Sequence, residues 1–285
     1  MAIGVFVIPG LLFYTLVVIV PIFFTICYSL NEWNGIGESV FVGIRNYRDL
    51  VVEDGFIKAV INSLVIAASS IMFQIPIGLF FALILARGIK GESLLRNIYF
   101  IPFIISTVVV CQLWMKIYHP HYGLLNLGLE KIGLENLINQ WLGNRDTALV
   151  AVIVPIIWQY IGYHMLLLYT SIKSIPKDIY EAAYIDGASN SQISFRITIP
   201  LIRPMLKTCI TLALIGALKI FDQVYLLTGG GPLHASEVPS TLMFQTIFHK
   251  SKYGYGSSMA VFIIVECLIL TLILQKAFKT RQYTY

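Results

Sequence analysis

Between two strongly apolar runs, residues 181–200 read EAAYIDGASNSQISFRITIP. A short helix is predicted at the start of this segment. Pro176 presets its first turn, and the carboxylates of Asp178 and Glu181 lie near its positive end. Gly187 supplies the left-handed residue that ends it.

A second short helix is predicted directly after the glycine. Ser189 and Gln192 are three residues apart and form a capping box, and Pro200 is expected to limit the other end of the helix. The two helices and the glycine between them predict a compact, rigid unit that another protein can grip.

The composition sets the class of protein independently of this segment. Hydrophobic residues make up 57% of the 285 residues, charged residues make up 12%, and the mean hydropathy is +0.78. The apolar runs reach the roughly 20 residues that a membrane crossing needs, and they are continuous rather than alternating, which favours helices over a barrel. We therefore predict an all-α integral membrane protein, a single domain of residues 1–285 with six transmembrane helices. These are predicted near residues 3–30, 57–86, 98–117, 147–172, 205–227 and 257–278.

The first apolar run is interpreted as a membrane span. It is about 28 residues long, whereas the apolar core of a signal peptide has about 7–15, and no charged leader precedes it. We expect it to be retained rather than cleaved.

The distribution of charge predicts the orientation. With the N-terminus in the cytoplasm, the inner loops hold eleven Lys and Arg residues and four acids, and the outer loops hold eight Lys and Arg residues and nine acids. Basic residues favour the cytoplasmic side. Both chain ends are therefore predicted to be cytoplasmic, and the net positive charge is expected to meet membrane lipid. No basic stripe with interleaved aromatic residues points to nucleic acid.

Several kinds of site have no support in the sequence. There is no phosphate-binding Gly-x-x-x-x-Gly-Lys-Ser/Thr loop, so ATP binding is not expected in this chain. The histidines are scattered and no metal site is expected. The four cysteines lie in four different predicted spans without paired spacing, and they are interpreted as core residues: Cys27, Cys111, Cys209 and Cys267.

The spacing within residues 181–200 resembles the coupling loop of ATP-binding-cassette importer permeases. In that family Glu-Ala-Ala is followed by three residues, Gly, nine residues and Ile-x-Leu-Pro, and only Ile199 departs from the pattern here. The swap keeps volume and polarity. The resemblance implies that residues 174–203 form a cytoplasmic loop that binds the ATPase. Its coupling residues would be Glu181, Ala182, Ala183, Asp186, Gly187, Ile197 and Pro200.

A second string, FDQVYLLTGGGP at residues 221–232, resembles the exit of the fifth span in maltose-type sugar permeases. That subtype is also found in glycerol-phosphate and oligosaccharide importers, and the resemblance covers all six predicted spans. It implies the type I importer permease fold, with a cytoplasmic coupling helix between spans 4 and 5.

The same resemblance implies the partners. We expect a second homologous permease subunit, two cytoplasmic ATPase subunits, an extracytoplasmic sugar-binding protein and a carbohydrate substrate. No cofactor and no enzymatic activity are expected in this chain, because ATP and Mg would bind to the ATPases. The expected location is a bacterial-type cytoplasmic (inner) membrane.

Two charges in the fifth predicted span are candidates for the substrate pathway. Lys219 and Asp222 are three residues apart, so one continuous helix would place them on the same face. They can point into a shared cavity, or they can form a structural ion pair. Glu266 in the last span is an isolated acid, and its role stays open.

The fourth predicted span carries a dense group of aromatic and amide side chains, which suits sugar binding by stacking and hydrogen bonds. Helical spacing divides them into stripes, so some are expected only to pack against other helices. Small residues in the fifth span either leave room for a sugar or let helices approach. The pathway candidates from both spans are Trp158, Gln159, Gly162, Tyr163, Met165, Ala213 and Ala217.

Alternatives from other functional classes remain at this stage. An ion-coupled secondary transporter could use Lys219, Asp222 and Glu266 as proton or cation groups, although such proteins usually have two matched halves. A membrane enzyme would need converging acidic residues or histidines, which are sparse here. The importer scaffold could also carry a non-sugar solute such as glycerol phosphate.

Overall fold

The computed structural model describes residues 2–278, with the backbone alone for residues 2–6. Helices dominate, and the strands β1 (Asn31–Glu32) and β2 (Val40–Phe41) pair as a small antiparallel hairpin. By length and composition, four helical segments of this part can cross a membrane, or six if each of two bent helix pairs is one span. The prediction of a helical protein with several apolar spans is confirmed, and the count of six stays a prediction. The four are Val7–Ser29, Asp54–Leu85, Ala148–Lys173 and Tyr253–Ala277.

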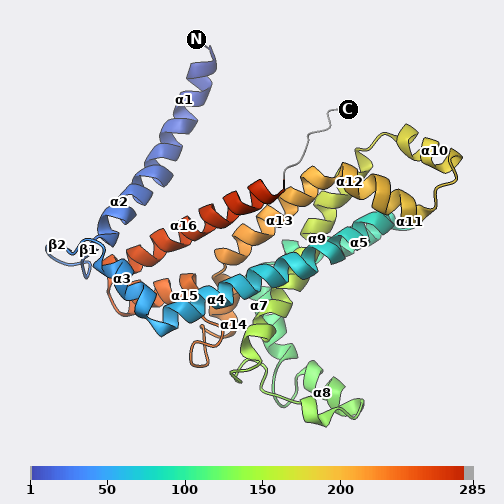
Figure 1. Cartoon of the computed structure of the whole chain (residues 1–285). Coiled ribbons are helices and arrows are strands. Elements are labelled where there is room, and N and C mark those ends of the chain that lie inside the picture. Colours follow the sequence, from blue (N-terminus) through green and yellow to red (C-terminus); the bar gives the residue numbers. More distant parts are fainter. Residues whose placement is uncertain (1, 279–285) are drawn as a thin grey trace.

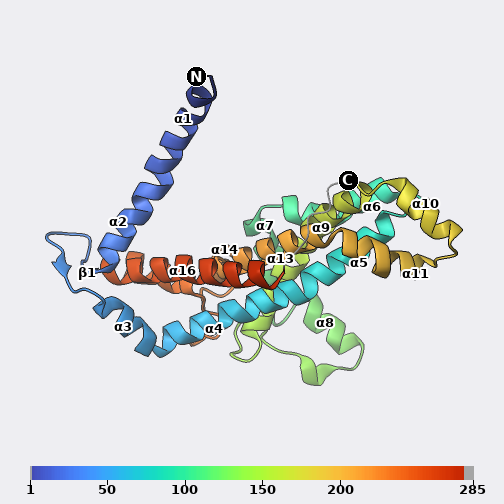
Figure 2. The same ribbon diagram turned by 45° about the horizontal axis from the view of Figure 1, so that its top comes forward.

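The N-terminal helix stands apart from the rest of the molecule. It consists of α1 (Ala2–Tyr14), the π-helical turn η1 (Thr15–Ile19) and α2 (Val20–Ser29). Figures 1 and 2 both show it extending away from the other helices, with its α2 end packed against α16 (Tyr253–Ala277). Its apolar side chains are exposed nearly all round, which suits a helix in contact with lipid or another subunit.

The centre of the bundle is α9 (Ala148–Lys173), the most buried of the four long spans. It packs against α6 (Glu92–Ile104) and against the span made of α4 (Asp54–Ser69), the π-helical turn η2 (Ser70–Gln74) and α5 (Ile75–Leu85). A Cβ at Gly78 in α5 would lie 3.0 Å from the backbone nitrogen of Met165, so α5 and α9 meet at their backbones. Glycine permits this approach because it has no side chain.

The third predicted span is bent rather than straight. α6 ends at Ile104, and α7 (Thr107–Ile117) begins three residues later at an angle of 94°. Ile105 and Ser106 are extended, with ψ of 139° and 135°. Pro102 lies in the last turn of α6, where its missing N–H weakens the helix. The expectation of one helix over residues 98–117 is therefore corrected to two.

The fifth predicted span is also interrupted. α13 (Arg203–Leu218) ends before Lys219, and α14 (Asp222–Leu227) begins after Phe221, whose φ and ψ are −133° and −57°. The carbonyl of Ile220 accepts a hydrogen bond from the Ser240 hydroxyl instead of a helical N–H. The premise that Lys219 and Asp222 share one helix face is therefore wrong, because the helix stops between them.

The connection between α9 and α13 contains the two predicted short helices. α10 (Lys177–Ile185) comes before Gly187, and a helix formed by α11 (Asn190–Gln192), the π-helical η4 (Ile193–Thr198) and α12 (Ile199–Leu201) follows it. The prediction that Pro200 ends this helix is wrong by a short distance, since the helix continues through Leu201 and bends by 70° into α13. The missing N–H of proline is tolerated here because η4 has already displaced the hydrogen-bond ladder.

The loop 118–147 is ordered by one asparagine. The Asn126 side chain donates to the carbonyls of Pro120 and Asn139, both at 3.0 Å, and accepts from Trp141 Nε1 at 2.7 Å. These bonds tie α8 (Leu124–Lys131) to the chain on both sides of it, with the 3-10 turn η3 (Glu135–Leu137) between α8 and Asn139.

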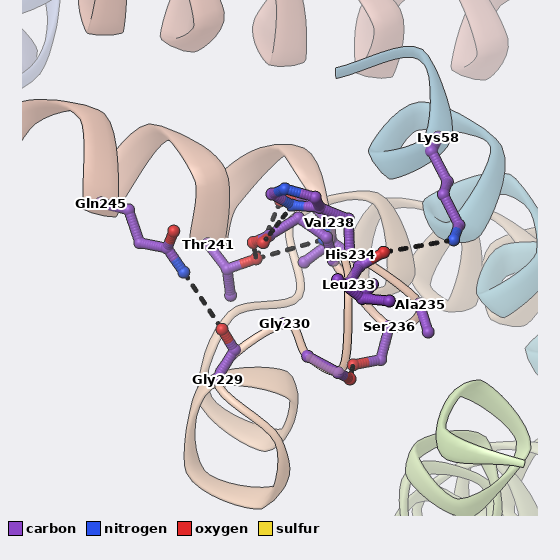
Figure 3. A network of polar contacts seen from close by, with 12 residues as sticks. Lys58, Gly229, Gly230, Leu233, His234, Ala235, Ser236, Val238, Thr241 and Gln245 are labelled. Carbon is purple, nitrogen blue, oxygen red and sulfur yellow. Dashed lines mark hydrogen bonds and ion pairs between the residues drawn. The ribbon is translucent and has the colours of Figure 1, made fainter. Parts of the chain in front are cut away.

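The remaining elements lie at the same end as the β1–β2 hairpin. α3 (Arg45–Val52) precedes α4, and α15 (Pro239–Phe244) and the π-helical η5 (Gln245–His249) precede α16. The turn between α14 and α15 forms the polar network of Figure 3, in which Lys58 reaches the carbonyl of Leu233 and Gln245 reaches that of Gly229.

Asn62 of α4 anchors the turn between α14 and α15 by hydrogen bonds. Its amide nitrogen donates to the carbonyls of Ala235 at 3.1 Å and Glu237 at 2.8 Å, with a longer contact of 3.4 Å to His234. The Glu237 carboxylate is buried, where it accepts from Thr241 and contacts His234 Nδ1 at 3.2 Å. The Asn62 side chain thus donates to several carbonyls that lie outside a helix and have no helical N–H as a partner.

Replacing Asn62 with leucine should loosen the turn. The Asn62→Leu variant leaves buried carbonyls without donors, at about 1–3 kcal/mol for each unsatisfied group. We expect faster limited proteolysis within residues 228–238 of the purified protein, while Ile61→Leu, on the exposed neighbouring position, serves as the control. Equal cleavage rates in the two variants would contradict the anchoring role.

Candidate functional site

The first candidate surface is the helical hairpin of residues 177–201, called the 177–201 hairpin below. Gly187 has a φ of +76°, and Ser189 makes both bonds of the capping box, with Gln192 N at 3.3 Å from its hydroxyl and Gln192 Oε1 at 2.8 Å from its N–H. The predicted local structure is confirmed. Figures 1 and 2 show α10 and α11 projecting beyond the other helices, at the end opposite to β1.

Four of the seven predicted coupling residues of the 177–201 hairpin are exposed. Ala183 is buried and Ile197 and Pro200 are half-buried, so these three hold the unit together. The four exposed ones are Glu181, Ala182, Asp186 and Gly187. Exposed carboxylates beside a tight turn can contact a partner without rearrangement of the backbone.

Large apolar side chains are also exposed on this hairpin. Ile185 is 86% exposed, and Tyr184 and Phe195 are exposed as well. Sequence reasoning did not single out these three residues, although apolar positions of α10 other than the buried Ala183 could have indicated Tyr184 and Ile185; Phe195 lies in η4. An exposed apolar cluster beside polar residues is typical of a protein contact surface.

Side chains near the end of α9, which leads into the hairpin, connect α9 to α6. The Tyr169 hydroxyl donates to Glu92, and Lys173, the last residue of α9, pairs with the same carboxylate at 3.6 Å. Tyr180 of α10 lies 3.4 Å from the Thr198 hydroxyl across the hairpin. A displacement of the hairpin would therefore act on α9 and α6 together.

The second candidate site is a cavity of about 360 Å³ inside the bundle. Four elements enclose it, namely η2, the end of α6, the middle of α9 and the last half of α13. Its wall combines aromatic rings, hydroxyls and an amide with small and aliphatic residues. The lining residues are Ser70, Gln74, Phe103, Ile156, Tyr160, Tyr163, His164, Leu212, Ala213, Gly216, Ala217 and Ile220.

Three of the predicted pathway residues line this cavity, namely Tyr163, Ala213 and Ala217. Tyr163 stacks on Phe103 of α6, with ring centroids 4.6 Å apart. The two alanines, together with Gly216, leave the cavity open along α13. Leu212 and Gly216 are exposed there, so the cavity opens along α13 to the outside of the helix bundle.

The other predicted pathway residues have different surroundings. Trp158 packs edge-on against Trp114, Met165 is fully buried in the apolar core, and Lys219 and Asp222 are exposed at the break between α13 and α14. None of them lines the cavity, and a role for them in transport stays a prediction.

Gln159 is placed between two interrupted helices. Its amide nitrogen lies 3.5 Å from the carbonyl of Ile105, where α6 ends, and its Oε1 accepts from Gln223 of α14 at 3.1 Å. These bonds give Gln159 a structural role, whether or not it also meets a substrate.

His164 is a buried polar residue of the cavity wall. Its side chain is 2% exposed, and its Nδ1 has no hydrogen-bond partner in the described structure. Leaving such a group unsatisfied costs about 1–3 kcal/mol. Glu266 of α16 also has an unpaired buried oxygen, but it lies outside the cavity.

Comparison with known proteins identifies the family. Residues 74–282 match the family model described as "Binding-protein-dependent transport system inner membrane component". The chain belongs to this family. The match begins at Gln74 in η2 and covers the 177–201 hairpin, α16 and every cavity-lining residue except Ser70.

Similar proteins cover almost the whole chain. The probable ABC transporter permease protein YurN of Bacillus subtilis is 39% identical over 278 residues, which are 96% of this chain and 95% of that protein. The trehalose/maltose transport system permease protein MalF of Thermococcus litoralis is 34% identical over 277 residues, with 97% and 93% covered. The permease is accordingly a multi-pass membrane protein of the ABC transporter class.

A solved structure confirms the fold. The crystal structure of a bacterial alginate ABC transporter, in complex with a periplasmic protein bound to an alginate pentasaccharide, contains a chain with a TM-score of 0.85. The identity is 23%, and 98% of this permease and 94% of that chain are covered. The two chains therefore share one fold over nearly their whole length.

Several cavity residues were missed at the level of sequence. Ser70, Gln74 and Phe103 come from α4–η2–α5 and α6, which the sequence marked only as apolar spans. The predicted span 57–86 contains two amide side chains, Asn62 and Gln74, and the amide of Gln74 was the available signal for the cavity. Its hydrogen bond to Ser70 at 3.2 Å follows the π-helical turn that brings both residues to the cavity.

Gly162 should tolerate no side chain. A Cβ at this position would lie 1.9 Å from the backbone oxygen of Tyr99, so Gly162→Val would push α6 away from α9. We expect a loss of several kcal/mol of stability. The melting temperature of the detergent-solubilised protein measures it, with Gly216→Ala as the control, because a Cβ at Gly216 meets nothing within 4 Å. Unchanged melting of Gly162→Val would refute the close packing.

Proposed function

We propose that this permease is the transmembrane subunit of an ATP-driven, binding-protein-dependent carbohydrate importer, and that it forms half of the translocation pathway. The observation that carries the proposal is the cavity of aromatic rings and hydroxyls between η2, α6, α9 and α13, within a chain of this family. The trehalose/maltose relative that covers nearly the whole chain supports carbohydrate as the substrate class.

The composition of the cavity suits a sugar. Aromatic rings stack on the apolar faces of sugar rings, and hydroxyl and amide groups bond to sugar hydroxyls. Phe103, Tyr160 and Tyr163 supply the rings, and Ser70 and Gln74 supply polar groups. The opening along α13 leaves room for a second homologous permease to complete the pathway.

The 177–201 hairpin is proposed as the contact with one of two cytoplasmic ATPase subunits. In this arrangement six spans cross the membrane, both chain ends lie in the cytoplasm, and the coupling helix is α10. ATP and Mg bind to the ATPases, and this chain itself performs no hydrolysis. The exposed Glu181, Asp186 and Ile185 supply the polar and apolar parts of the contact surface.

Transport follows from two global states that nucleotide biases. ATP binding closes the two ATPases and draws the two hairpins together, and hydrolysis reverses the movement. The pairing of Lys173 and Tyr169 with Glu92 passes the movement from the end of α9, which leads into the hairpin, to α6, whose last turn carries Phe103 of the cavity wall. An extracytoplasmic sugar-binding protein delivers the substrate to the opposite side.

Lys219 and Asp222 are proposed to lie along the pathway beyond the cavity. They are exposed at the break between α13 and α14, next in the chain to Ile220 of the cavity wall. Charged side chains are costly in lipid, so a water-filled pathway or the second permease is the expected surrounding of Lys219 and Asp222.

The proposed function predicts sugar-stimulated ATP hydrolysis. The permease should be reconstituted in lipid vesicles with its neighbouring permease, ATPase and binding protein, and hydrolysis should be measured across mono- and oligosaccharides. We expect stimulation by one sugar class and no effect of a protonophore. Stimulation by no carbohydrate, in a complex with basal hydrolysis, would reject the substrate class. Uptake that stops with the protonophore would instead favour an ion-coupled transporter.

The ATPase contact predicts a specific uncoupling variant. Ile185→Glu places a charge in the centre of the apolar contact, and Glu181→Lys reverses a charge at its edge, so we expect both to abolish sugar-stimulated hydrolysis while membrane insertion persists. Ile36→Glu is the matched control, because Ile36 and Ile185 are 83% and 86% exposed, and Ile36 lies between β1 and β2, which Figure 1 shows at the end opposite to α10. Normal stimulation of Ile185→Glu would remove the assignment of the hairpin.

A further inference from the structure

The cavity wall contains a polar side chain that the packing of the bundle does not use. His164 is almost fully buried, lines the cavity, and has an unpartnered Nδ1. Its closest described ring contact is the edge of Tyr163, with centroids 5.2 Å apart. Buried polar groups normally have a partner, and this one belongs to a residue of the cavity wall, so a solute that enters the cavity can be the missing partner.

Packing alone does not account for a histidine at this position. The next residues inward on α9, Met165 and Leu168, are fully buried and apolar, and they fill the core against α5. An aliphatic residue at position 164 would pack in the same way without an unsatisfied nitrogen. An imidazole, by contrast, offers a donor on one nitrogen and an acceptor on the other when it is uncharged.

The rest of the wall indicates the kind of solute. No carboxylate, ammonium or guanidinium group is among the described residues that line the cavity. Lys219 and Asp222 follow the wall in the chain but are not part of it. A charged solute would lose its hydration there without gaining a counter-charge, whereas an uncharged hydroxylated solute would exchange water for hydroxyl, amide and imidazole groups.

We propose that the cavity selects uncharged, polyhydroxylated solutes over acidic or phosphorylated ones, and that His164 is a specificity-determining residue that hydrogen-bonds one hydroxyl of the solute. This inference deepens the proposed carbohydrate import and rests on it. A hydroxyl both donates and accepts, so it matches the imidazole. Ser70 and Gln74, which also line the cavity, bond additional hydroxyls of the solute.

The test uses the complete transporter in vesicles. The stimulating neutral oligosaccharide is compared with its monodeoxy analogues, with a uronic-acid oligosaccharide and with glycerol 3-phosphate. Binding of each compound to the isolated binding protein is measured separately, so that only compounds it delivers are compared. The variants are His164→Leu, which keeps the packing, His164→Gln, which keeps donor and acceptor groups, and Leu168→Met as a volume-conserving control away from the cavity.

The expected result is a loss that depends on one hydroxyl. His164→Leu should transport the parent sugar about tenfold more slowly, consistent with one lost hydrogen bond. Wild type and His164→Leu should transport one particular deoxy analogue at similar rates, because the bonded hydroxyl is already absent. His164→Gln should restore part of the loss, and Leu168→Met should behave as wild type.

Two outcomes would overturn the inference while the proposed function stands. If His164→Leu slows the parent sugar and every deoxy analogue by the same factor, His164 has only a structural role. If the uronate or glycerol 3-phosphate is delivered and transported as fast as the neutral sugar, the cavity does not select against charge. Failure of every carbohydrate to stimulate the wild-type complex is a different result, because it rejects the proposed function itself.

Discussion

The backbone contacts of α9 constrain the rest of the structure. On one side Gly78 lets α5 approach until a Cβ would lie 3.0 Å from Met165 N, and on another side Gly162 lets α6 approach until a Cβ would lie 1.9 Å from Tyr99 O. Helices in lipid gain little from burying apolar surface, so close backbone packing is a main source of their association. The cavity lies beside these two contacts, where η2, the end of α6, α9 and α13 meet.

The interrupted helices depend on polar groups held inside the bundle. A break in a membrane helix leaves carbonyls and N–H groups that lipid cannot satisfy. Gln159 contacts the carbonyl of Ile105 at the α6 break and joins Gln223 beyond the α13 break, while Ser240 bonds the carbonyl of Ile220. Gln159, one of the predicted sugar-binding residues, therefore helps to secure the two bends beside the cavity.

Local signals in the sequence were strong enough to predict the helices and the 177–201 hairpin. The capping box at Ser189 and the glycine at 187 act within a few residues, and the apolar runs act through length alone. The bends at Ile105 and Lys219 were missed because they depend on partners far along the chain. For the same reason the sequence did not single out Ser70, Gln74 and Phe103 as cavity residues, since no period within one helix shows which neighbour it faces.

The isolated N-terminal helix has a consequence for biosynthesis. Among the described residues, α2 packs mainly on α16 and on the short β1 strand, and Ser29 precedes Tyr253 by more than 200 residues. At about 5–20 residues per second, the ribosome needs roughly 10–40 s to make the intervening chain. The first span thus enters the membrane long before its helical partner exists, and its apolar surface on nearly every side lets it wait there as a separate lipid-embedded helix until the last span arrives.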